Sequence, residues 1–136
     1  MTIAIMKNLT PVLSVNNIED SLPFWTERLK FTKTIEAPGE NGLNFCALQR
    51  GDVEVMLQTK ASIKDDLPQV AALGFQGGGV MLFVKVEDLE EIISAVEGCE
   101  IIVPDRTTFY GMREIGVRAP GGCVILFAQR VGEEDG

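Results

Sequence analysis

The sequence contains no histidine, and only one tryptophan and one tyrosine, among its 136 residues. The missing histidine excludes Ser-His and Cys-His pairs and removes both the usual general base near neutral pH and the commonest metal ligand. No apolar run reaches the roughly 18 residues that a membrane-spanning helix needs. The short apolar start of the chain also lacks the cleavage site of a signal peptide. We therefore expect a protein that does not enter a membrane.

Cysteine and basic residues are also scarce. Cys46, Cys99 and Cys123 form an odd, widely spaced set without a C-x-x-C pair, which is typical of reduced packing residues in a cytoplasmic protein. The 12 Lys and Arg against 20 Asp and Glu give a net charge of −8. Because nucleic acid and anionic lipid would be repelled, we expect neither as a partner. A cationic small molecule is compatible with this charge.

An internal repeat is the main feature that the sequence does contain. Val15-Asn-Asn-Ile-Glu-Asp-Ser-Leu22 is similar to Val86-Glu-Asp-Leu-Glu-Glu-Ile-Ile93, which follows it by 71 residues, and the same step carries Gln58 onto Gln129. Two copies of one unit must bury their apolar faces together. The space where they meet predicts a ligand site.

Each copy is predicted to contain one strand, one helix and three further strands. Asn17 and Asp88 are expected N-caps, each with an acidic residue three positions later. Pro23 lies within the first helix and should distort it. The predicted strands are Thr10–Val15, Phe31–Glu36, Leu43–Arg50, Asp52–Thr59, Val80–Val86, Glu100–Val103, Phe109–Ala119 and Gly122–Arg130.

This order predicts an α+β fold in which two tandem βαβββ modules form a cupped mixed sheet. We expect a single domain, with module 1 at about 8–59, module 2 at about 80–130, and a connector at 60–79 that contains a short helix and ends at Gly77-Gly-Gly79. The apolar strands exceed what two helices can cover, so a second copy should close the sheets. The predicted assembly is a homodimer.

Four motifs occur in order along nearly the whole chain. They are Val15-Asn-Asn-Ile-Glu-Asp-Ser-Leu-Pro-Phe-Trp25, Leu29-Lys-Phe31, Phe109-Tyr-Gly-Met-Arg-Glu114 and Arg118-Ala-Pro-Gly-Gly122. They resemble V-x-D-x-x-x-S-x-x-F-Y, L-G-F, Y-G-x-R-E and R-D-P-x-G of the vicinal oxygen chelate superfamily, which includes glyoxalase I, extradiol dioxygenases, fosfomycin-resistance enzymes and bleomycin-resistance proteins. The resemblance implies a cup in which His, Gln or Glu from both modules hold a divalent metal.

The resemblance places these metal ligands at Thr10, Met81, Leu126 and, depending on a two-residue register, Glu54 or Met56. Met and Leu offer no oxygen or nitrogen donor to a hard cation, so we expect no metal and no other cofactor. Glu54 is the only weak candidate for a ligand. What remains resembles the bleomycin-resistance branch, whose members lack the metal site, form intertwined dimers and sequester a ligand.

We therefore predict metal-independent binding or sequestration of a small hydrophobic or aromatic molecule, including a cationic one, with no catalytic residue. One alternative is a lyase or isomerase of the same superfamily with an atypical site that uses Glu54, Arg113 or Tyr110. Another is a cup filled by its own side chains. The predicted ligand-binding residues are Thr10, Phe45, Met56, Met81, Phe83, Tyr110, Met112, Arg113 and Leu126.

Strand alternation and packing give further expectations. Trp25 should lie in the core, close behind the cup. Arg113 and Glu114 are adjacent, so one should face the cup and the other solvent. Glu54 is the single carboxylate that we expect to be able to lie inside the cup. The segment Phe109–Met112 is either a ligand contact or an ordinary hairpin.

Overall fold

The computed structural model describes residues 3–74 and 80–131, so the predicted Gly77–Gly79 end of the connector lies outside the described residues. The order of elements confirms an α+β fold with two βαβββ modules. The elements are β1 (Val12–Val15), α1 (Ile18–Leu22), η1 (Pro23–Arg28), β2 (Thr32–Gly39), β3 (Gly42–Arg50), β4 (Val53–Thr59), α2 (Lys60–Asp66), α3 (Pro68–Ala71), β5 (Met81–Lys85), α4 (Leu89–Ala95), β6 (Ile101–Thr107), β7 (Met112–Arg118) and β8 (Val124–Arg130).

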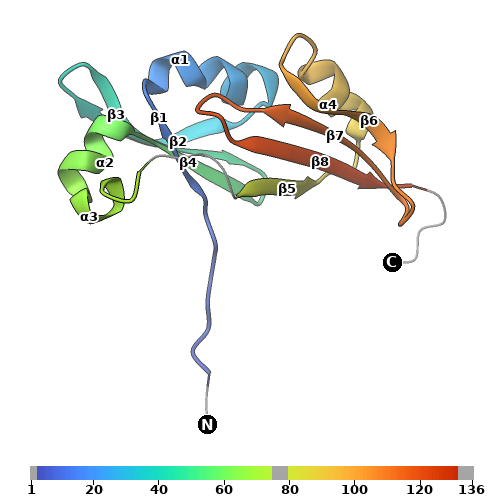
Figure 1. Cartoon of the computed structure of the whole chain (residues 1–136), viewed down its shortest axis with the longest axis horizontal. Coiled ribbons are helices and arrows are strands. Elements are labelled where there is room, and N and C mark those ends of the chain that lie inside the picture. Colours follow the sequence, from blue (N-terminus) through green and yellow to red (C-terminus); the bar gives the residue numbers. More distant parts are fainter. Residues whose placement is uncertain (1–2, 75–79, 132–136) are drawn as a thin grey trace.

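Each module forms a four-stranded mixed sheet, in the order β1-β4-β3-β2 and β5-β8-β7-β6. The first strand of each module pairs in parallel with the last, and the other pairs are antiparallel. Figure 1 shows the two sheets side by side, with α1 and α4 along the same side of them. We call the face of each sheet that packs against α1 or α4 the helix face, and the opposite face the open face. No helix within the described ranges is long and apolar enough to cross a membrane.

Both predicted helix starts are confirmed. The Asn17 side chain accepts a hydrogen bond from the Asp20 backbone N–H at 2.8 Å, and the Asp88 side chain accepts one from the Glu91 N–H at 3.3 Å. Each cap satisfies one of the N–H groups that the first helical turn leaves without a partner. After α4, Gly98 has a φ of 89°, a conformation that suits glycine at the end of a helix.

Pro23 distorts the first helix, as predicted. Proline has no N–H to continue the α-helical pattern, and the chain changes there from α1 to the π-helix η1. In this wider turn, the Leu29 N–H donates to the Phe24 carbonyl at 3.1 Å. The wider turn lets the consecutive residues Phe24 and Trp25 both point inward, and both are buried.

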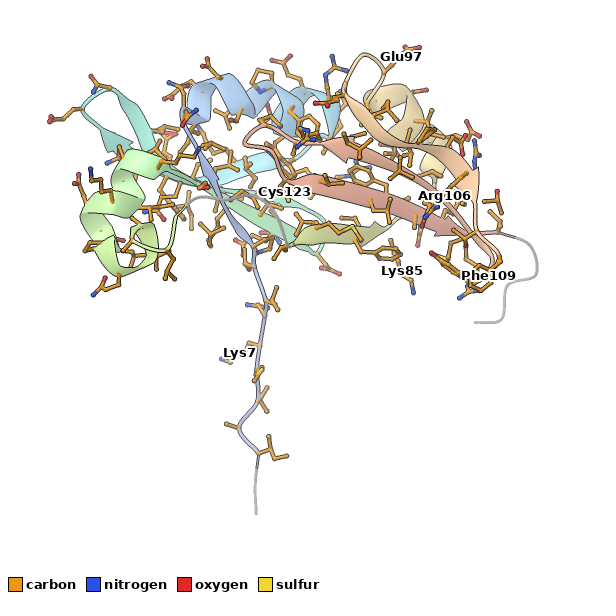
Figure 2. All side chains as sticks on the ribbon, in the orientation of Figure 1. Lys7, Lys85, Glu97, Arg106, Phe109 and Cys123 are labelled. Atoms are coloured by element: carbon orange, nitrogen blue, oxygen red, sulfur yellow. The ribbon has the colours of Figure 1, made fainter. Side chains whose placement is uncertain are left out.

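Two arginines connect the modules on the helix side. Arg28 of η1 donates to the carbonyls of Ala95 and Glu97 at 3.2 and 2.6 Å, where the last carbonyls of α4 lack helical partners. Arg50, at the end of β3, pairs with Glu91 of α4 at 2.8 Å. Glu97 is labelled on the upper loop beyond α4 in Figure 2. These contacts fix the position of one module relative to the other.

The core lies between the helices and the helix faces of both sheets, and it is continuous across the two modules. Trp25 lies in the core, as predicted. Its ring packs edge-on against Phe24 and Phe31, at centroid separations of 5.2 and 5.3 Å. Ile18 and Leu89, the first residues of α1 and α4, are both fully buried.

The repeat step of 71 residues holds for the helices but not for the last strands. Ile18 and Leu89 are 71 residues apart and begin equivalent helices. Gln58 lies on the open face, paired with Phe45, whereas Gln129 lies on the helix face and accepts the Leu89 N–H at 2.8 Å. A difference of one residue reverses the direction of a strand side chain. The predicted match of Gln58 with Gln129 is therefore wrong.

Two strands run past the ends that we expected. β2 continues through Pro38 beyond the predicted end at Glu36, and β6 continues through Pro104 beyond Val103. Both are edge strands, where a missing N–H can face away from the sheet. The strand pairing shifts register beside each proline, so the prolines mark irregularities within the strands rather than their ends.

Candidate functional site

Seven of the nine predicted ligand-binding residues lie on the open side of the sheets. Their neighbours in the strands, such as Val55 and Leu57 on either side of Met56, belong to the core, and alternation turns the residues between them to the opposite face. The seven residues are Thr10, Phe45, Met56, Met81, Phe83, Met112 and Leu126. Tyr110 is in a turn, and Arg113 is on the helix face.

Module 1 contributes a polar pair and an aromatic ring to its open face. The Thr10 hydroxyl donates to Glu54 Oε1 at 3.0 Å, which places Glu54 beside Thr10. Phe45, half-buried on the neighbouring strand β3, lines a cavity of about 560 Å³ together with Gln58. Gln58 Nε2 donates to the Ser62 hydroxyl at 3.0 Å, which connects the floor of this cavity to α2.

The rim of this cavity is acidic. Asp65 and Asp66 of α2 line it opposite Phe45, and α2 stands at the outer end of module 1 in Figure 1. Carboxylates attract a cation by charge, and an aromatic face adds attraction through its quadrupole. The arrangement suits an apolar ligand that carries an amine.

Module 2 has an open face that is partly exposed and partly filled. Met81 and Phe83 of β5 are 61% and 50% exposed, whereas Leu126 on the neighbouring strand is buried. A Cβ atom added to Gly116 would lie 3.0 Å from Val103 Cβ and 3.1 Å from Leu126 Cδ1. Val103 and Leu126 therefore close over Gly116, and only the β5 side of this face remains open to a ligand.

A buried ion pair lies farther along this face. Glu114 has an exposed fraction of 0%. Its Oε1 accepts a hydrogen bond from Nε of Arg106 at 2.8 Å and forms an ion pair with Nη2 of Arg106 at 2.6 Å. Glu114 Oε2 is buried and has no hydrogen-bond partner among residues 3–74 and 80–131. Our expectation that only Glu54 could be an internal carboxylate is therefore wrong, because strand alternation turns Glu114 inward.

Arg113 faces the other way. Its guanidinium contacts Asp105 at 2.6 and 2.9 Å and Glu90 of α4 at 2.6 Å. The hydrogen bonds to Asp105 and Glu90 raise the pKa of Arg113. Those from Arg113 to Asp105 lower the pKa of the Asp105 carboxyl. The prediction that Arg113 and Glu114 face opposite sides is confirmed. Arg113 is not brought together with the residues of the open face.

Arg106 belongs to none of the four motifs, so sequence reasoning did not identify it. Figure 2 shows Arg106, Lys85 and Phe109 toward the end of module 2 that lies away from module 1. Lys85 is on the open face as well, because β5 pairs Lys85 with Ala128, and Ala128 pairs in turn with Glu114.

The segment before β7 is a turn rather than the start of that strand. Gly111 has a φ of 85°, a conformation that glycine adopts without strain, and the Thr108 hydroxyl accepts the Met112 N–H at 3.1 Å. The rings of Phe109 and Tyr110 contact each other edge-on, with centroids 5.1 Å apart, and both side chains are exposed. A ligand contact and an ordinary hairpin are both compatible with this turn.

The register of the strands identifies the fourth position implied by the superfamily. Met56 pairs with Val12 in module 1 as Leu126 pairs with Phe83 in module 2, so Met56, not Glu54, is the counterpart of Leu126. The neighbouring position Met81 also lacks a hard donor. Within the described part of the chain, no group of three or more His, Cys, Asp and Glu could hold a metal ion. The residues present do not fit a hard divalent cation.

Cys46 is buried, and Cys99 and Cys123 are partly shielded from solvent. Burial raises the pKa of the Cys46 and Cys123 thiols, which favours the protonated and unreactive form. Cys46 and Cys123 therefore serve as packing residues, as predicted from their spacing.

The sequence model described as the Glyoxalase/Bleomycin resistance protein/Dioxygenase superfamily matches residues 7–127. The chain belongs to this superfamily. No protein of curated function matches the sequence.

Solved structures of similar fold cover nearly the whole chain. A glyoxalase/bleomycin resistance protein/dioxygenase from Nocardioides has a TM-score of 0.72 and 21% identity, covering 99% of this chain and 91% of its own. TioX from Micromonospora sp. ML1 has a TM-score of 0.70 and 17% identity, with 93% and 100% covered. A family enzyme from Burkholderia phytofirmans PsJN has a TM-score of 0.74 and 17% identity, with 90% and 97% covered. At these identities the similarity extends to the fold alone.

Proposed function

We propose that the protein binds or sequesters a small hydrophobic or aromatic molecule on its open faces, without a metal ion, as members of the bleomycin-resistance branch do. One observation carries the proposal: the four positions implied for metal ligands lie on the open faces but hold Thr10, Met56, Met81 and Leu126. Thioether and aliphatic groups adapt to apolar surfaces and do not bind hard cations.

The acidic cavity of module 1 supports a ligand that carries a positive charge. Asp65 and Asp66 would neutralise an amine while Phe45 packs against the apolar part of the molecule. The half-exposed Phe83 of module 2 offers a second apolar surface. The ligand class that fits both faces is an aromatic amine or a similar amphiphilic cation.

A second copy of the chain is the partner that we propose. The segment before β1 extends away from the body (Figure 1), and its apolar side chains Ile3, Ile5, Met6 and Leu9 are 85%, 86%, 95% and 91% exposed. Apolar side chains in such number are rarely left in water. A homodimer would bury them and enclose the open faces as well.

The alternative is an enzyme of the same superfamily, a lyase or isomerase, with an atypical site. The observation that favours it is Glu114, a buried carboxylate with one oxygen held by Arg106 and the other without a partner in the described residues. A general base needs a carboxylate oxygen that can accept a proton from the substrate, and the second oxygen of Glu114 is a candidate for this role. Turnover of a bound compound that disappears in Glu114→Gln would favour this alternative over binding.

The test is a titration with the compound that most stabilises the protein in a thermal-shift screen of aromatic amines. Extensive dialysis against EDTA should leave both affinity and melting temperature unchanged. Phe45→Ala should weaken binding about five- to hundredfold, the usual effect of removing a stacked ring, because Phe45 lines the acidic cavity. Trp25→Phe should instead lower stability and leave affinity nearly unchanged, because Trp25 lies in the core.

Two results would contradict the proposal. Loss of binding on dialysis, restored by one equivalent of zinc, nickel or manganese, would show a metal-dependent site. Normal binding by Phe45→Ala would show that the ligand lies elsewhere.

A further inference from the structure

A second cavity lies on the helix side of the molecule, where the two modules meet. Its volume is about 590 Å³, within the range of about 300–1,000 Å³ that is typical of small-molecule sites. Both modules contribute to its apolar wall, which includes Trp25, Phe31 and Val55 from module 1 and Val84, Ile125 and Phe127 from module 2. We call it the junction cavity. Strand alternation turns Val84 and Val55 of its wall away from Phe83 and Met56 of the open faces.

Charged residues lie at the mouth of the junction cavity, and one of them, Arg50, already has partners within the protein. Arg50 Nη2 pairs with Glu91 Oε2 at 2.8 Å across the modules, and Arg50 Nη1 donates to the Leu29 carbonyl at 3.0 Å. Two of the lining residues, Arg50 and Lys85, are basic. Four are acidic, and they include Asp52 and Glu91. An acidic rim disfavours anions, and an apolar wall disfavours any desolvated charge. The cavity therefore suits an uncharged molecule.

The wall of the junction cavity is also aromatic, because Trp25, Phe31 and Phe127 contribute to it. Aromatic rings pack favourably against one another, edge-on or offset. We propose that the junction cavity is a second binding site, which takes a small neutral aromatic molecule.

This site is independent of the ligand that we propose for the open faces. The molecule it accepts is neutral, whereas the cavity beside Phe45, Asp65 and Asp66 suits a cation. Occupation of the junction cavity would also brace the two modules against each other, because its wall comes from both.

Trp25 is the only tryptophan of the chain, so its fluorescence reports on the junction cavity directly. The probe is 4-bromoacetophenone, a neutral aromatic molecule that carries a heavy atom able to quench indole emission. We expect quenching that saturates with probe concentration. Collisional quenching by acrylamide should show no saturation and should decrease when the probe is bound.

Matched variants locate the binding. Val84→Phe fills the cavity and should weaken the probe at least about tenfold, because a well-packed wall cannot accommodate both. Val12→Phe adds the same group to the open face, where Val12 is 50% exposed, and should leave the titration unchanged. Val53→Phe narrows the mouth at a position that is already 40% exposed, so it tests the site even if Val84→Phe is unstable.

Quenching that never saturates, or that is the same in all three variants, would overturn the site itself. So would a change in sedimenting mass that accompanies the quenching, because the cavity would then belong to an interface between copies.

Discussion

Replacing Arg106 by alanine should destabilise the fold, because it removes the cation that pairs with the buried carboxylate of Glu114. Glu114 is 0% exposed, and Arg106 provides a hydrogen bond and an ion-pair contact to its Oε1. Arg106→Ala leaves a buried carboxylate without any partner. Breaking a fully buried pair in this way costs about 3–5 kcal/mol. We expect about 2–3 kcal/mol, because the Arg106 side chain is itself 57% exposed and water can replace part of it.

The assay is urea unfolding at neutral pH. With a denaturant slope of about 1–3 kcal/mol per M for a domain of this size, the midpoint should fall by roughly 1 M or more. Glu114→Gln removes the charge and keeps the shape, so the double variant Arg106→Ala/Glu114→Gln should be more stable than Arg106→Ala alone. Arg118→Ala is the matched control, since Arg118 and Glu100 form an exposed pair at 3.2 Å that should contribute less than about 1 kcal/mol.

The reasoning is refuted if Arg106→Ala costs no more than Arg118→Ala. That result would mean that Glu114 obtains its stabilisation from another source, such as buried water or a bound ligand. A double variant that is as unstable as Arg106→Ala would also contradict it, because the cost would then come from lost packing by the arginine stem.

The remaining predictions concern assembly and pH. Sedimentation equilibrium at micromolar concentration should show a dimer that dissociates when Ile3, Ile5 and Leu9 are changed to serine; a single species of 14.8 kDa for the wild type would contradict the homodimer. The hydrogen bonds from Arg113 lower the pKa of the Asp105 carboxyl below its ordinary value of 3.8, so Asp105 stabilises the fold above that value and loses its effect as the pH falls through the lower folded pKa. The stability difference between wild type and Asp105→Asn should therefore be present near neutral pH, shrink as the pH falls below 3.8, and be modest throughout because the pair is exposed; a difference that grows on acidification would refute this.

The elements that could be predicted from the sequence are those that local physical chemistry specifies. Asn17 and Asp88 have side chains that cap helices, and both do so. Pro23 removes an N–H from a helix and changes its winding there. The open-face placement of Met56 and Phe83 follows from strand alternation, once the strands are recognised.

What could not be predicted depends on strand register and on contacts between the modules. Arg50 and Glu91 are far apart in sequence, and nothing local indicates that they meet at 2.8 Å. The junction cavity depends on the same relative placement of the modules. The predicted match of Gln58 to Gln129 was wrong because the last strand of module 2 is offset by one residue from the 71-residue repeat that the helices follow. Sequence similarity did not reveal this offset.

The pairing of Arg106 with Glu114 illustrates how register determines the candidate site. Val103 pairs with Gly116, and continuing that register would place Asp105 opposite Glu114, so that two carboxylates would face each other. The register shifts between Val103 and Arg106, and Arg106 pairs with Glu114 instead. The shift contains Pro104, whose missing N–H makes it a suitable residue for a bulge.

The same shift benefits both faces of the sheet. It brings a cation to the buried Glu114 on the open face, and it leaves Asp105 to accept two hydrogen bonds from Arg113 on the helix face. Without the shift, two acids would repel each other on one face and two arginines on the other, and such opposed like charges destabilise a strand pair. Electrostatics therefore favours the irregular register over the regular one, and the inward-facing carboxylate of the candidate site is a consequence of that choice.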